Sequence, residues 1–451
     1  MHETTRTTQA LAIALLLAPI LGHAAESAST VPSQASSSAT LSRATLPNAL
    51  APTRSDDYKD PDMWARIRSG YAIPDVDNAL VAKHVQWYAS RPDYLTRMSS
   101  RASLYLYHVV KELENRGMPT ELALLPVIES AFNPQALSTA NAAGIWQFMP
   151  DTGKTFSLQQ NMFKDERRGV LASTDAALTY LQRLYTMFGD WQLALAAYNW
   201  GEGNVQKAIQ KNRALGKPTD FESLADLMPA ETRNYVPKLQ AVKNIIANPA
   251  QYGVALPAID NTPYFTTIDK TSDIDMAVAA QLAEMSLDEF KALNPQFKKP
   301  VIAGDSKILL PKENAEKFHL NLASWSQALS SWTTHKITSA KESIASLASK
   351  FGTTPEVIRQ ANNIPPQMRL MAGSTILVPK TEATAHNDIA ENIIENAQVM
   401  LEADRAKGRG GDGKKLSGVQ RIKATAAHAV AEIKSRVSRK PAVNANGRKR
   451  R

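Results

Sequence analysis

The stretch ELALLPVIESAFNPQALSTANAAGIWQFMP, from Glu121 to Pro150, is the most informative part of the sequence. It places Leu122, Leu125 and Glu129 at helical spacing, so Glu129 is expected on the apolar face of a helix. A carboxylate there is costly unless it is paired or protonated, and burial raises its pKa. Such a carboxyl is suited to general acid catalysis near neutral pH. The alternative is a structural role, in which Glu129 pairs with an arginine or caps a neighbouring helix.

Small and polar residues follow this predicted helix and lead into an aromatic segment. Gly144, after two alanines, permits close backbone contact. Trp146 has a flat apolar ring and the adjacent Gln147 has an amide. Together they are suited to binding the face of a sugar ring and its substituents. For Trp146 the alternative is simple packing in the core.

The region from Asp60 to Pro249 is predicted to form one mostly helical domain of ordinary size. Two of its later helices carry further candidates: Tyr198 and Asn199 before a Gly-rich exit, and Tyr235 near a helix start. The alternatives are that Asn199 caps its helix and that Tyr235 is a core residue with a satisfied hydroxyl. The segments with apolar residues at helical spacing are Val81–Tyr88, Ser103–Arg116, Glu121–Ser130, Thr174–Phe188, Trp191–Tyr198, Val205–Lys211 and Glu231–Ala247.

An internal repeat follows, in which Leu282–Lys312 aligns with Leu347–Lys380. Each copy is predicted to contain two short helices and a Gly turn that leads into an apolar strand. The second copy also opens with a β-like segment at 335–338, which makes it a βααβ unit of under 50 residues. An Asn lies 17 positions before a Pro in both copies, as Asn294 and Pro311 and as Asn362 and Pro379.

Composition excludes several classes of function. The 451 residues include no cysteine, which rules out disulfides, thiolate metal sites and a thiol nucleophile. The eight histidines form no His-x-x-x-His pair, so no metal site is expected. Most of the net charge of +9 lies in Leu401–Arg451, which holds 15 Lys/Arg and four Asp/Glu. The remainder is nearly neutral, and a nucleic-acid-binding core is therefore not indicated.

The two ends of the chain differ from the predicted domains. An apolar run at Ala10–Leu21, followed by small residues, predicts an export signal over residues 1–25, with an uncleaved membrane anchor as the alternative. Residues 26–59 are rich in Ser, Ala, Thr and Pro and predict a flexible linker. Residues 381–451 are expected to be a basic, largely disordered tail with a helix over Asp388–Arg405. Its charge would attract anionic lipid or acidic envelope polymer.

Four segments together resemble the family-1 lytic transglycosylases, over about residues 60–250. The long tract from Gly117 onward resembles the membrane-bound lytic transglycosylase D subgroup, and the repeats resemble LysM modules. The resemblance implies an α+β protein, with a mostly α, lysozyme-like catalytic domain followed by small βααβ modules at 262–313 and 334–380. The matching motifs are Glu129-Ser130, Gly144 to Gln147, Ala197 to Gly201 and Glu231 to Tyr235.

The resemblance also implies an activity that needs no cofactor. Glu129 would protonate the oxygen that joins N-acetylmuramic acid to N-acetylglucosamine and would then act as base on the muramyl C6 hydroxyl, giving a 1,6-anhydro product. One carboxylate suffices because the substrate supplies its own nucleophile. Tyr235 would bond near this carboxyl. The residues implied for the substrate cleft are Ser138, Gly144, Trp146, Gln147, Tyr198 and Asn199.

Two departures from the family pattern affect this interpretation. The chain has no Cys to carry a lipid, so an exported, periplasmic protein that is not a Cys-lipidated lipoprotein is expected. The second repeat reads Ala340-Lys341-Glu342-Ser343 where LysM units usually have a Gly-Asp-Thr-like turn, and the first copy, a degenerate module, departs further. Either repeat could be a glycan binder or a spacer. The alternative functions are a hydrolytic muramidase and an inactive scaffold that binds peptidoglycan glycan strands.

Overall fold

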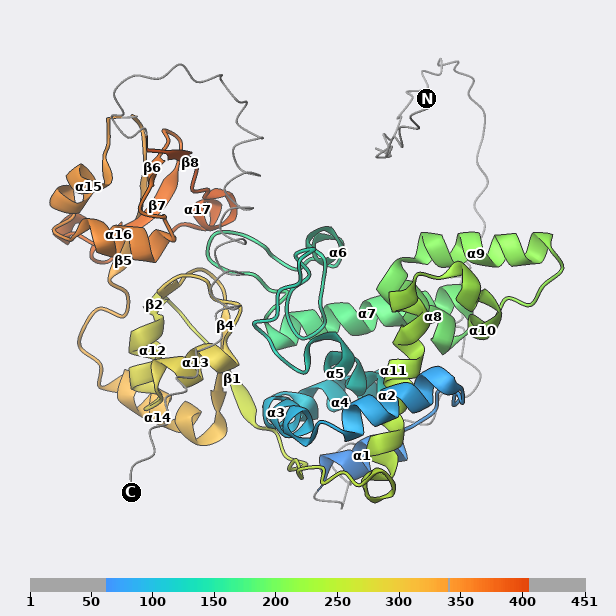
Figure 1. The fold of residues 1–451 in the computed structure, drawn as a ribbon. Helices are drawn as coiled ribbons and strands as arrows, with labels where there is room; N and C mark the ends of the chain where they lie inside the picture. Colours follow the sequence, from blue (N-terminus) through green and yellow to red (C-terminus); the bar gives the residue numbers. More distant parts are fainter. Residues whose placement is uncertain (1–61, 340, 405–451) are drawn as a thin grey trace, which may run out of the picture. The chain divides into compact units, whose positions relative to one another are not determined.

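The computed structural model describes residues 62–339 and 341–404. A helical domain comes first along the chain, and two small units of helices and short strands follow it (Figure 1). The predicted α+β class is confirmed. The predicted export signal, the linker and most of the basic tail lie outside the described residues. Within the described ranges, no helix is long and apolar enough to cross a membrane.

The helical domain is built around one large apolar core, in which α2 packs against α11 and α7 packs against α8. Local signals set the helix ends: Gly189 ends α7 at a φ of 68°, and the side chain of Asp190 accepts the backbone N–H of Leu193 to begin α8. The helices are α1 (Met63–Ser69), α2 (Ala79–Ala89), α3 (Pro92–Ala102), α4 (Leu106–Asn115), α5 (Leu125–Ser130), α6 (Pro150–Thr155), α7 (Val170–Phe188), α8 (Trp191–Trp200), α9 (Glu202–Ala214), α10 (Phe221–Leu224) and α11 (Ala230–Ala247), with 3₁₀ helices at Thr120–Leu124, Ala225–Leu227 and Pro249–Tyr252.

The helix predicted over Glu121–Ser130 is in fact two pieces, a 3₁₀ helix that ends at Leu124 and the short α5. Pro126 has no N–H to donate, and it lies in the first turn of α5, where that donor is not needed. The buried carboxylate of Glu121 accepts hydrogen bonds from the backbone N–H groups of Ala72 and Ile73. It also forms an ion pair with Lys243. These contacts fix the 3₁₀ turn in the core.

The first small unit contains both helices of the predicted repeat between antiparallel strands. Strand β1 (Phe265–Asp269) pairs with β4 (Lys307–Pro311), and β2 (Ile274–Asp275) pairs with β3 (Val301–Ile302). The helices are α12 (Met276–Leu282) and α13 (Leu287–Leu293), with α14 (Lys312–Ala323) added after the closing strand. This copy therefore has an opening strand of its own.

The second small unit has the predicted βααβ order. Strand β5 (Trp332–Lys336) pairs with β7 (Thr375–Pro379) in antiparallel register, and β6 (Met368–Leu370) lies before β7 in the chain. The two helices between the outer strands are α15 (Ile344–Lys350) and α16 (Pro355–Asn362).

The repeated asparagine explains the constant spacing in both copies. The Asn294 side chain donates to the carbonyl of Leu309 and accepts its N–H, both at 2.8 Å. Asn362 makes the same pair of bonds to Leu377, at 2.8 and 2.7 Å. Each side-chain amide thus acts as one more strand residue, joining the end of the second helix to the closing strand. The bonded carbonyl and N–H would otherwise be buried without a partner.

The prediction of a largely disordered tail is wrong for residues 381–404. This segment contains α17 (Glu391–Asn396) and β8 (Leu401–Ala403), and β8 pairs with β6. Ile389 and Ile394 are buried in a cluster shared with Val301 and Leu377, so they cover apolar surface of both small units. The helix predicted over Asp388–Arg405 is confined to α17, because the residues after it bond as a strand.

Replacing Asn362 by alanine leaves the buried N–H and carbonyl of Leu377 unpaired. We expect Asn362→Ala to lower the free energy of unfolding by about 2 kcal/mol and to increase hydrogen exchange at the Leu377 amide. Denaturant titration and hydrogen exchange measure the two effects. Gln360→Ala, at an exposed position of α16, is the matched control. Equal stability of the two variants would contradict this interpretation.

Candidate functional site

Glu129 lies at the end of α5, with its carboxyl against the long helix α11. The hydroxyl of Tyr235, on α11, donates to Oε1 of Glu129 at 2.5 Å. Ala131 and Phe132 both have positive φ, 53° and 54°, and their N–H groups bond back to Val127 and Pro126. This left-handed turn closes the helix and is strained for residues other than glycine. The helix therefore ends one residue after Glu129.

Burial of the Glu129 carboxyl raises its pKa to about 7. The negative charge of Glu231 acts in the same direction, while the hydrogen bond from Tyr235 and the charge of Lys238 oppose it. The side chain is only partly exposed, and Tyr198 and Tyr235 beside it have pKa values raised well above normal by burial and by this carboxylate. Near neutral pH such a carboxyl can both donate and accept a proton. The sequence-based expectation of a carboxyl with a raised pKa is met, whereas its catalytic role stays a prediction.

The predicted residues of α8 face the same region. The hydroxyl of Tyr198 donates to the carbonyl of Trp146 at 2.9 Å, and Oδ1 of Asn199 accepts from the hydroxyl of Thr232 on α11 at 2.8 Å. Gly201, with a φ of 93°, occupies the C-cap of α8, so the alternative in which Asn199 caps the helix is wrong. Thr232, which sequence reasoning did not single out, orients the Asn199 amide.

A loop between α5 and α6 carries the other candidates. Oγ of Ser138 accepts the N–H groups of Ala140 and Ala142, and the Gln147 amide donates to the carbonyl of Gly144 at 2.8 Å. Both side chains are only partly exposed and help to fold the loop. The loop is tied to α5 because Oγ of Ser130, next to Glu129, donates to the carbonyl of Ile145 at 3.0 Å.

The structure corrects the prediction that the Trp146 side chain binds substrate. Trp146 is 0% exposed, and its indole N–H donates to Oγ1 of Thr174 on α7. An indole enclosed in the core offers no face to a sugar, so the packing alternative holds. Gly144 is also buried and can contribute only backbone.

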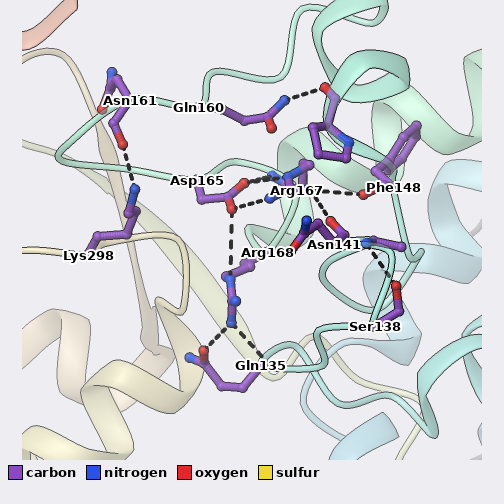
Figure 2. Close-up of polar contacts among 12 residues, drawn as sticks. Gln135, Ser138, Asn141, Phe148, Gln160, Asn161, Asp165, Arg167, Arg168 and Lys298 are labelled. Carbon is purple, nitrogen blue, oxygen red and sulfur yellow. Dashed lines mark hydrogen bonds and ion pairs between the residues drawn. The ribbon is translucent and has the colours of Figure 1, made fainter. Parts of the chain in front are cut away.

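A buried ion pair beneath this loop was missed by sequence reasoning. Arg167 and Asp165 are 7% and 8% exposed and form two parallel bonds at 2.9 and 2.8 Å (Figure 2). The only sign of this pair in the sequence is that Asp165 and Arg167, two residues of opposite charge, lie two positions apart shortly before Gly169. Opposite charges at this spacing are more often found on exposed loops, so the sequence alone did not mark them as buried.

No group of three or more Asp, Glu or His side chains in residues 62–339 and 341–404 could hold a metal ion. The grouping around Glu129 consists of its own carboxyl, with that of Glu231 nearby, two tyrosine hydroxyls, an asparagine and the loop between α5 and α6. Such a set can transfer protons and bond to the hydroxyls and amides of a ligand.

Three family models match the chain. The transglycosylase SLT domain matches residues 107–221, which contain Glu129 and α8. The LysM-like domain of lytic transglycosylase MltD matches residues 264–327, and the LysM domain matches residues 340–379. The two small units of the fold thus correspond to LysM-like domains.

Similar proteins carry related names. Membrane-bound lytic murein transglycosylase D of Escherichia coli is 38% identical over 319 residues, 68% of this chain and 70% of that protein. A putative tributyltin chloride resistance protein of an Alteromonas species is 42% identical over 176 residues, 38% of this chain and 82% of that protein. The solved structure of the 70 kDa soluble lytic transglycosylase of Escherichia coli matches 31% of this chain and 23% of its own, with 27% identity and a TM-score of 0.26.

Proposed function

The chain belongs to the peptidoglycan lytic transglycosylases, and we propose that Glu129 performs the proton transfers of their reaction. The observation that supports this most is its carboxyl, buried enough to have a pKa of about 7 and bonded to Tyr235. The protonated carboxyl gives its proton to the bridging oxygen as the bond from that oxygen to C1 of the muramyl residue breaks. The carboxylate then takes the proton of the muramyl C6 hydroxyl as its oxygen bonds to C1. No water is consumed.

Tyr235 has the second role in this proposal. Its hydroxyl donates to the carboxylate form of Glu129, which stabilises the charge left after the first proton transfer. The bond also fixes the direction of the carboxyl group. Tyr235 is 4% exposed and is held in α11, so this orientation is set by the fold before substrate binds.

Ser138, Gln147, Tyr198 and Asn199 form the substrate cleft in this proposal. This assignment is supported because each of these side chains is only partly exposed and carries a hydroxyl or an amide. Such groups form hydrogen bonds with the hydroxyl and acetamido groups of sugars. The backbone of Gly144 belongs to the same loop. The LysM-like domains imply peptidoglycan as the binding partner, and we assign the glycan strand chiefly to the second, residues 334–380.

Replacing Glu129 by glutamine retains the shape and removes the proton. We expect Glu129→Gln to lower the release of 1,6-anhydromuropeptides from purified peptidoglycan by at least about 100-fold, while sedimentation with the peptidoglycan is retained. Mass spectrometry of the soluble products measures this. Glu231→Gln, an exposed carboxylate nearby, is the control and stays active. Full activity of Glu129→Gln would remove this residue from its role, and products heavier by one water would indicate a muramidase.

Replacing Tyr235 by phenylalanine removes a hydrogen bond that favours the charged carboxylate and lowers its pKa. The pKa of Glu129 then rises above its value of about 7, and the carboxyl keeps its proton to higher pH. We therefore expect the alkaline limb of the kcat/KM profile to move to higher pH in Tyr235→Phe, with a lower maximal rate. Tyr105→Phe is the control, because that hydroxyl bonds to the carbonyl of Ala292 and not to Glu129. An unmoved limb in Tyr235→Phe would argue against the bond acting on Glu129.

We also propose that the protein is exported and acts in the periplasm, where the basic residues after Asp404 hold it near anionic envelope components. The support is the apolar run at Ala10–Leu21 and the cluster of Lys and Arg near the end of the chain. Truncation after Asp404 keeps β8 intact. We expect this variant to be extracted from envelope fractions at lower salt than the full chain. Recovery of the full chain in the cytoplasm would refute export, and unchanged extraction would refute the role of the charge.

A further inference from the structure

Arg167 bonds to both ends of the turn at residues 141–148, which is part of the loop between α5 and α6. Its Nη1 donates to the carbonyls of Asn141 at 2.7 Å and Phe148 at 3.1 Å (Figure 2). The N–H and carbonyl of Ala143 pair with Phe148 across the same turn. One guanidinium group thus closes the turn from residue 141 to residue 148, the part of the loop that contains Gly144 and Gln147.

Asp165 fixes the orientation of this guanidinium group. Its two carboxylate oxygens accept from Nε and Nη2 of Arg167, and the group is almost fully buried. A bidentate pair of this kind sets the plane of the guanidinium as well as its position. Nη1 is therefore aimed at the two loop carbonyls before any substrate arrives.

The backbone of Arg167 is equally close to the turn. A Cβ placed on Gly144 would lie 1.8 Å from the carbonyl oxygen of Arg167, and Gly144 has a φ of 83°. Only glycine fits there, so the turn wraps tightly around residue 167 and has little room to shift.

The same turn also bonds to two residues next to the proposed catalytic carboxyl. The carbonyl of Ile145 accepts from Ser130, the residue after Glu129, and the carbonyl of Trp146 accepts from Tyr198. Movement of the turn would therefore change the protein atoms that surround the Glu129 carboxyl and its access to water.

We infer that Arg167, oriented by Asp165, is a positioning residue for the transglycosylase reaction, because it holds the 141–148 turn against Ser130 and Tyr198 beside Glu129. This inference rests on the proposed function of Glu129. Arg167 itself does not touch the reacting atoms.

The first LysM-like unit supports this arrangement from outside the helical domain. The N–H of Asp165 donates to the carbonyl of Gln296, and the N–H of Lys298 donates to the carbonyl of Phe163. The Lys298 ammonium group also donates to the carbonyl of Asn161 at 2.7 Å, as Figure 2 shows. The segment that carries Asp165 and Arg167 is thus paired with a second backbone rather than left as a free loop.

Arg167→Lys retains the positive charge and removes the planar fork. An ammonium group has three N–H donors, so it cannot keep both bonds to Asp165 together with the bonds to the two carbonyls. We expect kcat for anhydromuropeptide release from soluble glycan strands to fall by about 10- to 100-fold, with a much smaller change in KM. A loosened turn admits water to the Glu129 carboxyl, and the alkaline limb of the pH profile moves to lower pH. Hydrogen exchange at the amides of Ala143 and Phe148 increases.

Arg168→Lys is the matched control, because Arg168 bonds to Gln135 and lies 4.0 Å from Asp165 but makes no bond to the 141–148 turn. If Arg167→Lys does not fold, Asp165→Asn, which loses one arm of the pair, is measured in the same way. Wild-type kcat, pH profile and exchange in Arg167→Lys would overturn the inference, as would a loss of activity that only follows the unfolded fraction. Activity in Glu129→Gln would defeat the proposed function instead, and the exchange measurement would still decide whether Arg167 holds the turn.

Discussion

The withdrawal of one carboxyl from water is the constraint on which the rest of this site depends. Glu129 has its pKa raised to about 7 by burial, and the hydrogen bond from the Tyr235 hydroxyl is the larger of the two interactions that limit the rise. Both groups need rigid supports, since a change of an ångström in either would alter the balance. The short α5, closed by two residues with positive φ, and the long α11 provide them. The fold places these helices side by side although the two residues are 106 positions apart.

Around that carboxyl the structure uses backbone carbonyls as fixed points. Ser130, Tyr198 and Arg167 each bond to carbonyls of the loop between α5 and α6, from α5, α8 and the segment before α7 respectively. The loop has small side chains and a required glycine, so it can approach these groups closely. An irregular segment is thereby made as well defined as a helix, which a site that orients a sugar chain requires.

Much of this organisation could be predicted from the sequence, where the signal is local. Helical periodicity predicted the helical domain, and the alignment of the two repeat copies predicted two short helices and a closing strand in each. The constant Asn-to-Pro spacing was visible in the sequence, but the bonds of Asn294 and Asn362 to the closing strands were found only in the structure. Contacts between distant segments were not predictable in this way. Trp146 was expected in the substrate cleft, with core packing as the alternative, and its partner Thr174 lies on another helix. Arg167 was not singled out, and Ile394 lay within the predicted tail, because the surfaces that bury them belong to other segments of the chain.

The two LysM-like units are stabilised by one common segment, residues 388–403. Its strand β8 pairs with β6 of the second unit, and its apolar side chains cover surface of both units. The burial of the Glu129 carboxyl can be measured by titrating it in ¹³C-glutamate-labelled protein by NMR, with its signal assigned through Glu129→Gln. We expect a midpoint of about 7 for this carboxyl. A midpoint near the ordinary glutamate value of about 4.3 would show a hydrated carboxylate and would contradict this expectation.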